Sequence, residues 1–186
     1  MKIDFNKFIK KRHARDYAVY SLIIALGVVI DQITKWLAVK YLAPNGDAPI
    51  WEGVLHLHFH LNDGAAFGSF SGKPYIFNTL SVIIIAGMLL YLYLGHADSL
   101  LSGIASAMIV SGGIGNMIDR VATGEVVDFI YFKLIDFAIF NGADSFVCVG
   151  AGLLILALVL DIVKEAKAAK AAKAGGARSG SEDGEE

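Results

Sequence analysis

The chain has 186 residues, of which 55% are hydrophobic and 18% charged, and its formal net charge is −2. Soluble domains contain about 45–50% apolar and about 25% charged residues, so this composition argues against both a disordered chain and an ordinary soluble enzyme. The near-neutral charge gives no reason to expect a nucleic-acid partner, and a single cysteine excludes an intramolecular disulfide.

Taken in chain order, a basic segment at residues 1–16 precedes the first of four long apolar runs. A helix that crosses a bilayer needs about 20 mostly apolar residues, and the runs lie at about 17–39, 75–94, 100–117 and 145–163. The first run is longer than the apolar part of a signal peptide and contains Asp31 and Lys35, so we interpret it as a retained helix. The sequence predicts an all-α integral membrane protein with four transmembrane helices.

Basic residues flank the predicted membrane domain, residues 17–163, at both ends. The positive-inside rule then puts both termini in the cytoplasm and the two longer connections, about 41–74 and 118–143, on the outer side. The segment 164–186 is basic at first and then acidic, with glycine and serine, and we interpret it as a disordered cytoplasmic tail.

The first outer connection contains a strand signal. Residues 54–61 alternate between apolar and polar side chains, which is typical of a half-exposed strand, and a turn signal follows at Asn62. We therefore expect a small β element outside the membrane. His56, His58 and His60 share one face of this strand, but no acidic ligand is fixed in register, so a solvated face is favoured over a metal site.

Acidic side chains gather near the outer ends of the predicted helices. Asp31 lies roughly 21 Å along a helix from Tyr17, and Lys35 follows one turn later as an i,i+4 partner. Asp119, Asp128 and Asp144 belong to the same level, accompanied by Asn62, Asn116 and Asn141. Ionisable groups at membrane depth are costly, so this cluster is a candidate functional site.

Simpler explanations exist for individual members of the cluster. Asp144 by itself is better explained as the N-cap of the fourth helix, Asp119 and Arg120 form a possible interfacial ion pair, and Asp31 with Lys35 forms another. None of these explanations accounts for so many carboxylates at one depth.

Two close carboxylates can share one proton, because neighbouring like charges do not both ionise readily. Such a pair hydrolyses peptide bonds without a metal, a cofactor or a nucleophilic side chain. The rival class is a proton or ion pathway, or an assembly factor, but a pathway needs polar groups through the whole membrane depth. An intramembrane protease of presenilin type is disfavoured, because its Gly-x-Gly-Asp motif is absent.

Four sequence blocks carry a family resemblance. They are Asp-Gln-Ile-Thr-Lys at 31–35, Asn-Asp-Gly-Ala-Ala-Phe-Gly at 62–68, Gly-Asn-Met-Ile-Asp-Arg at 115–120 with Val-Val-Asp-Phe at 126–129, and Phe-Asn-Gly-Ala-Asp at 140–144. Together and in this order, they resemble lipoprotein signal peptidase, also called signal peptidase II, of bacteria.

The resemblance implies a fold, a reaction and a set of residues. The catalytic aspartates would be Asp128 and Asp144. The residues that bind substrate or support the site would be Asp31, Lys35, Asn62, Gly64, Asn116, Asp119, Arg120, Asn141 and Ala143. The family fold has four transmembrane helices, a small extracytoplasmic β cradle and a short extracellular helical segment.

The implied substrate is a prolipoprotein that carries diacylglycerol on its lipobox cysteine and is cut just before that cysteine. The resemblance further implies a cofactor-free, monomeric enzyme of the bacterial inner membrane that globomycin-type cyclic peptides inhibit. One departure concerns the stretch between Asp128 and Asp144, which is slightly short for the family, and another is Gly142, where a larger apolar residue is common.

Overall fold

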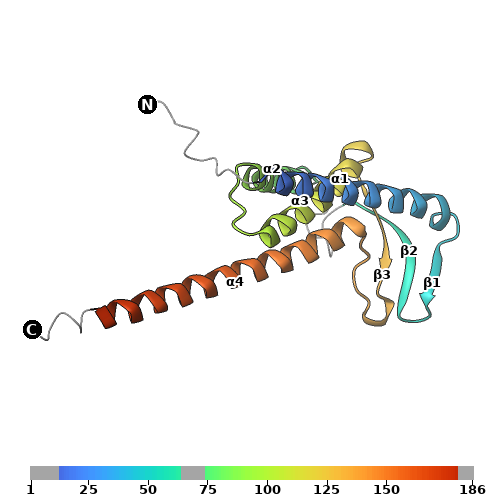
Figure 1. Cartoon of the computed structure of the whole chain (residues 1–186). Coiled ribbons are helices and arrows are strands. Elements are labelled where there is room, and N and C mark those ends of the chain that lie inside the picture. The colour runs from blue at the N-terminus through green and yellow to red at the C-terminus, as the bar shows by residue number, and fades with distance from the viewer. Residues whose placement is uncertain (1–12, 64–73, 180–186) are drawn as a thin grey trace, which may run out of the picture.

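The computed structural model describes residues 13–63 and 74–179 (Figure 1). The helical elements are α1 (Ala14–Leu37), the π-helical turn η2 (Ala38–Leu42), α2 (Pro74–Tyr93), α3 (Leu100–Ala122), the 3-10 turn η4 (Lys133–Ile135) and α4 (Gly142–Ser179). The strands are β1 (Asp47–Trp51), β2 (Leu55–Asn62) and β3 (Val126–Tyr131). The molecule is thus a helical body with a small sheet at one end.

Three helical segments of the described chain are long and apolar enough to cross a membrane, namely Ala14–Leu42, Leu100–Ala122 and Gly142–Lys170. The apolar part of α2 that is described, Asn78–Tyr93, is shorter. The membrane character expected from composition is therefore found, while the fourth transmembrane helix stays a prediction.

Small residues on α3 bring its neighbours close. A Cβ atom at Gly112 would collide with the carbonyl oxygen of Ala143 on α4, and one at Gly103 would enter the ring of Tyr20 on α1. Tyr20 is fully buried there. In membranes, where lipid is as apolar as leucine, such close backbone approach is what holds helices together. The glycine- and serine-rich composition of the third apolar run follows from this packing.

The strands form one antiparallel sheet in the order β1-β2-β3. β2 confirms the strand predicted at 54–61, with bounds shifted by one residue. The sequence did not predict β1 or β3. The sheet is attached to the end of η2, and Figure 1 shows its strands running across the direction of α1.

The histidines of β2 do not simply form a solvated face. His56 is buried, and its Nδ1 lies 2.7 Å from Oδ2 of Asp47 on β1, while Gly53 donates its backbone N–H to Nε2 at 3.1 Å. The expected solvated face is therefore wrong at His56, because the Asp47 side chain reaches its ring from β1 although Asp47 pairs with His58 in the sheet.

The segment after residue 163 also differs from expectation. The sequence predicts a disordered tail from residue 164, whereas α4 continues as a helix to Ser179. Alanine and lysine are strong helix formers, and their repeated occurrence here lets the helix run on past the apolar stretch. Residues 180–186, the acidic end of that predicted tail, lie outside the described part of the chain, as do residues 1–12.

Candidate active site

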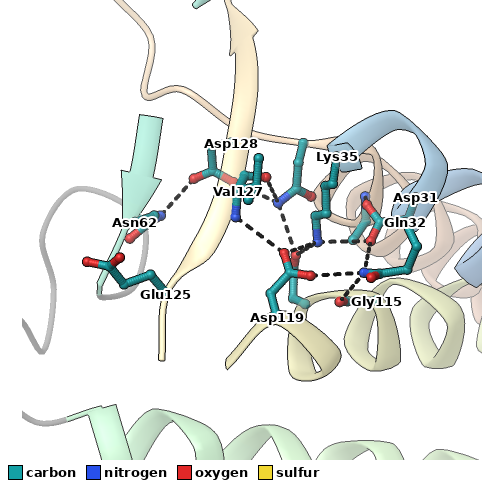
Figure 2. Close-up of polar contacts among 12 residues, drawn as sticks. Asp31, Gln32, Lys35, Asn62, Gly115, Asp119, Glu125, Val127 and Asp128 are labelled. Atoms are coloured by element: carbon teal, nitrogen blue, oxygen red, sulfur yellow. Dashed lines mark hydrogen bonds and ion pairs between the residues drawn. The ribbon is translucent and has the colours of Figure 1, made fainter. Parts of the chain in front are cut away.

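A buried polar cluster lies where α1, α3, α4 and β3 meet, and Figure 2 shows most of its contacts. Its members are largely shielded from solvent: Asp31 is 1% exposed, Lys35 3% and Asp128 1%. The other buried members are Asn116, Asp119 and Asn141. The sequence therefore predicted correctly that these side chains come together at one level.

Lys35 is the centre of the half of the cluster that α1 and α3 form. Its Nζ lies 2.8 Å from Oδ2 of Asp31 and 2.9 Å from Oδ2 of Asp119. It also donates a hydrogen bond of 2.8 Å to Oδ1 of Asn116. The i,i+4 pair expected on α1 is confirmed. Asp119 pairs with Lys35, whereas the sequence suggested Arg120 as its partner.

Asp119 also connects α3 to the sheet. Its Oδ2 accepts the backbone N–H of Val127 on β3 at 3.3 Å, and its Oδ1 accepts the side-chain amide of Gln32 at 2.9 Å. Gln32 donates as well to the carbonyl oxygen of Gly115 at 3.1 Å. The sequence reasoning missed Gln32, although a polar residue inside an apolar run beside Asp31 was an available signal.

The N-terminus of α4 is held by side chains of the cluster. Asn141 is the N-cap: its Oδ1 accepts the N–H of Asp144 at 3.0 Å, and Asp144 Oδ2 accepts the N–H of Asn141 at 3.1 Å, which is a capping box. The N–H of Ala143 donates to Asp31 Oδ1 at 2.9 Å. Asp144 was expected to be the cap itself and instead occupies the third position of the helix.

Asp128 lies on the strand β3, between the side-chain amides of Asn141 and Asn62. It receives the side-chain amide of Asn141 on Oδ1 at 2.7 Å and that of Asn62 on Oδ2 at 2.9 Å. Burial raises the pKa of Asp128 to about 6, a shift to which the charge of Asp144 adds and which the two amides oppose. A carboxyl group with this pKa exchanges its proton near neutral pH, as a general acid or base requires.

Asn141 and Asn116 connect the two aspartates that the resemblance singles out. Asn141 contacts Asp128 and Asp144 directly, and Asn116 donates its amide to Asp144 Oδ1 at 2.8 Å while it accepts from Asn141 at 3.0 Å. Arg120 is half-buried, and its charge acts on Asp144, Asp128 and Asp119. The structure thus brings together every predicted site residue except Gly64, which lies outside the described residues.

The comparisons with known proteins agree with this arrangement. The family model described as signal peptidase (SPase) II matches residues 23–160. The chain belongs to the signal peptidase II family. This membership makes it an aspartic-type signal peptidase, a hydrolase of peptide bonds.

Individual relatives support the same assignment. A lipoprotein signal peptidase of Halalkalibacterium halodurans is 38% identical over 151 residues, which cover 80% of this chain and 97% of the relative. One from Caldanaerobacter subterraneus is 45% identical over 130 residues, covering 70% and 88%. A solved structure described as a bacterial membrane enzyme has 35% identity and a TM-score of 0.70, covering 78% of this chain and 90% of that one. The helical body and its sheet are therefore those of a membrane peptidase.

Proposed function

We propose that this signal peptidase cuts diacylglyceryl-modified prolipoproteins immediately before the lipidated lipobox cysteine, with Asp128 and Asp144 as the catalytic pair. The observation that carries the proposal is the bridge by Asn141, which hydrogen-bonds to both carboxylates from the N-cap of α4. One of the two, Asp128, has a pKa of about 6 and so keeps a proton when an ordinary aspartate has lost it.

The two carboxyl groups share the work of peptide hydrolysis. The raised pKa of Asp128 makes it the proton donor to the carbonyl oxygen, and Asp144 then has the role of the base, which takes a proton from water as the water oxygen attacks the carbonyl carbon. Asp144 then gives its proton to the amide nitrogen while Asp128 takes a proton back from a hydroxyl group of the tetrahedral intermediate, and the C–N bond breaks. The released amine is the new N-terminus of the lipidated cysteine, and the signal peptide leaves with the new carboxyl group.

Lys35 and its partners have a positioning role in this proposal. The Lys35 ammonium neutralises charge between Asp31 and Asp119, at 2.8 and 2.9 Å. Asp119 then holds the start of β3 through Val127, and Asp31 holds the start of α4 through Ala143. The start of β3, which carries Asp128, and the start of α4, which carries Asp144, are thereby fixed to α1 and α3.

An apolar groove between α2 and α3 suits the lipid part of the substrate. Its volume is about 580 Å³, and it is lined by Val82, Ile85, Ala86, Leu89, Ile114, Met117, Ile118, Val121 and Ala122. The groove reaches the end of α3, three residues past Asp119 of the polar cluster. We assign to it an acyl chain of the diacylglyceryl group, which would hold the neighbouring peptide bond near the aspartates.

The same distribution of residues disfavours an ion pathway. The buried charges gather at one end of the helices, and the buried serines farther along α3, Ser102, Ser106 and Ser111, donate to backbone carbonyl oxygens. Within the described residues, these hydroxyls stabilise the helices and do not extend the charged cluster toward the other end.

The proposal includes a topology. Residues 17–163 form a single domain in the bacterial inner membrane, both termini lie in the cytoplasm, and the polar cluster lies at the outer leaflet, where a lipid-anchored substrate presents its scissile bond. The enzyme acts as a monomer without a cofactor and is inhibited by globomycin-type cyclic peptides.

The deciding experiment is a cleavage assay with the purified full chain in detergent. A diacylglyceryl-modified prolipoprotein is the substrate, an unlipidated copy is the matched control, and a third sample contains globomycin. We expect cleavage of the lipidated form alone and its loss with the inhibitor. Equal cleavage of both forms would contradict the assigned substrate, and no cleavage by folded protein would contradict the proposed function.

A further inference from the structure

The end of the sheet farthest from Asp128 carries a cluster of exposed, large apolar side chains. Ile50 and Trp51 of β1 are 62% and 68% exposed, and Leu134 and Ile135 of η4 are both 69% exposed. These four residues are called the sheet tip here. Trp51 pairs with Leu55 at one end of β2, whereas Asp128 pairs with His60 near the other end.

The two segments of the sheet tip are joined to each other. Leu134 donates its backbone N–H to the carbonyl oxygen of Val54, in the turn that follows Trp51, at 3.4 Å. The cluster therefore consists of two separate chain segments that present apolar side chains at one place. Turns in water are normally polar, and a group of large exposed apolar side chains usually marks an interaction site.

The direction of the strands identifies the surface that the sheet tip faces. Figure 1 shows the sheet projecting sideways from the end of α1, toward the side on which α4 lies. Because α1 and α4 are candidate membrane spans, a sheet that runs across α1 extends along the membrane surface. Its far end then overhangs the lipid beside the helices.

Aromatic residues at the end of α1 mark the level of that membrane surface. Trp36 and Tyr41 are 57% and 54% exposed, and the Lys40 ammonium lies 4.7 Å and 5.1 Å from their ring centroids. Tryptophan, tyrosine and lysine together are typical of the boundary between headgroups and acyl chains. β1 begins five residues after this turn ends, so the sheet starts at the same level.

We propose that the sheet tip inserts into the headgroup–acyl boundary of the bilayer and is a second membrane contact, separate from the transmembrane helices. The lipid bilayer is the favoured occupant because the sheet starts at the level marked by Trp36 and Tyr41 and runs across the direction of α1, so that its far end lies over lipid. The sheet is then held at both ends, by Asp119 at Val127 and by lipid at Trp51. Asp128, between these two contacts, is kept at a fixed height above the membrane.

Trp51 provides a direct test, because the chain has only two tryptophans. Replacement Trp36→Phe leaves Trp51 as the single fluorophore, and Trp51→Phe leaves Trp36 as a positive control on α1. Each full-length variant is reconstituted into phosphatidylcholine vesicles whose acyl chains are brominated either near the headgroup or near the terminal methyl. Iodide in the buffer serves as the water-phase quencher.

We expect Trp51 to lose about half or more of its intensity with bromine near the headgroup, to lose less with deep bromine, and to be protected from iodide. Adding Leu134→Ser and Ile135→Ser to the Trp36→Phe variant should shift the emission to the red and raise iodide quenching at least twofold. Strong quenching of Trp51 by iodide with none by brominated lipid would overturn the proposal. So would protection from both quenchers, which would indicate a protein contact instead.

Discussion

Asp31 Oδ1 accepts a hydrogen bond of 2.9 Å from the backbone N–H of Ala143, a residue 112 positions later in the chain. This contact joins the α1 part of the polar cluster to the first turn of α4. The Asp31 carboxylate meets the positive end of the α4 helix dipole and is paired with Lys35 at the same time. The position of Asp144, one residue after Ala143, therefore depends on α1.

Replacement of either proposed catalytic aspartate should abolish cleavage while the protein still folds. Asp128→Asn and Asp144→Asn keep the size of each side chain but remove its ability to exchange a proton. We expect kcat to fall by about a thousandfold or more in each. The measurement is single-turnover cleavage of lipidated substrate by protein that elutes as a single species in detergent.

Asp161→Asn is the matched control for that pair. Asp161 also lies on α4, but it is 31% exposed, and the Lys164 ammonium lies 3.7 Å from its carboxylate. Cleavage should remain within twofold of the parent chain. Full activity in Asp128→Asn or Asp144→Asn would exclude the proposed dyad.

The pH dependence of cleavage should follow the proton on Asp128. Its pKa is raised to about 6, so the protonated form is abundant below pH 6 and becomes scarce above it. If this proton is the one given to the carbonyl oxygen, kcat/KM should fall by about tenfold for each pH unit above 6. A rate that is flat from pH 6 to pH 8 would contradict this role.

Asn62→Ala should move that pH profile in a known direction. The Asn62 amide donates to Asp128 at 2.9 Å and thereby favours the ionised carboxylate. Without this amide the pKa of Asp128 rises further, so the pH above which kcat/KM falls should be higher than in the parent chain. A shift to lower pH would show that another group controls the decrease of kcat/KM with pH.

Loss of the Lys35 charge should destabilise the fold strongly. Lys35→Met leaves Asp31 and Asp119 buried without their cation, and removing one partner of a buried ion pair costs about 3–5 kcal/mol. Lys164→Met, at a lysine that is 74% exposed, should change stability by less than about 0.5 kcal/mol. Denaturant unfolding in detergent measures both, and equal effects would contradict the assigned role of Lys35.

Close packing between α3 and α4 gives a stability prediction with an internal control. A Cβ atom at Gly112 would collide with the carbonyl oxygen of Ala143, whereas nothing lies within 4 Å of one at Gly152. Gly112→Ala should cost about 1–3 kcal/mol and reduce cleavage, because the start of α4 must move. Gly152→Ala should be neutral or slightly stabilising. Thermal unfolding of the two variants, side by side, tests the difference.

The groove between α2 and α3 can be tested by filling it. Ala86 lines the groove, so Ala86→Trp should raise the KM for lipidated substrate by about tenfold with little change in kcat. The adjacent Gly87 has open space around its Cβ position and is not among the lining residues, so Gly87→Trp is the control. An equal effect of both variants would exclude the groove as the acyl site.

Much of this site was predictable because its parts are local. The Asp31–Lys35 pair follows from i,i+4 spacing on one helix, and the strand at β2 follows from its alternating pattern. β3 was missed because it is short and nearly uniformly apolar, without the alternation that marks a half-exposed strand. The role of Gln32 was missed for a different reason: its partners, Asp119 and Gly115, are more than 80 positions away.

The sequence by itself determined that the chain enters a membrane, which polar residues are costly there, and the family to which their order belongs. Composition and spacing suffice for these because burial in lipid acts on each segment separately. Only the tertiary structure decided that Asn141 caps α4 and contacts both aspartates, and that Lys35 is shared between Asp31 and Asp119. Those contacts depend on how closely the helices α1, α3 and α4 approach one another. That distance is decided by packing between the helices, which the sequence of any one helix does not determine.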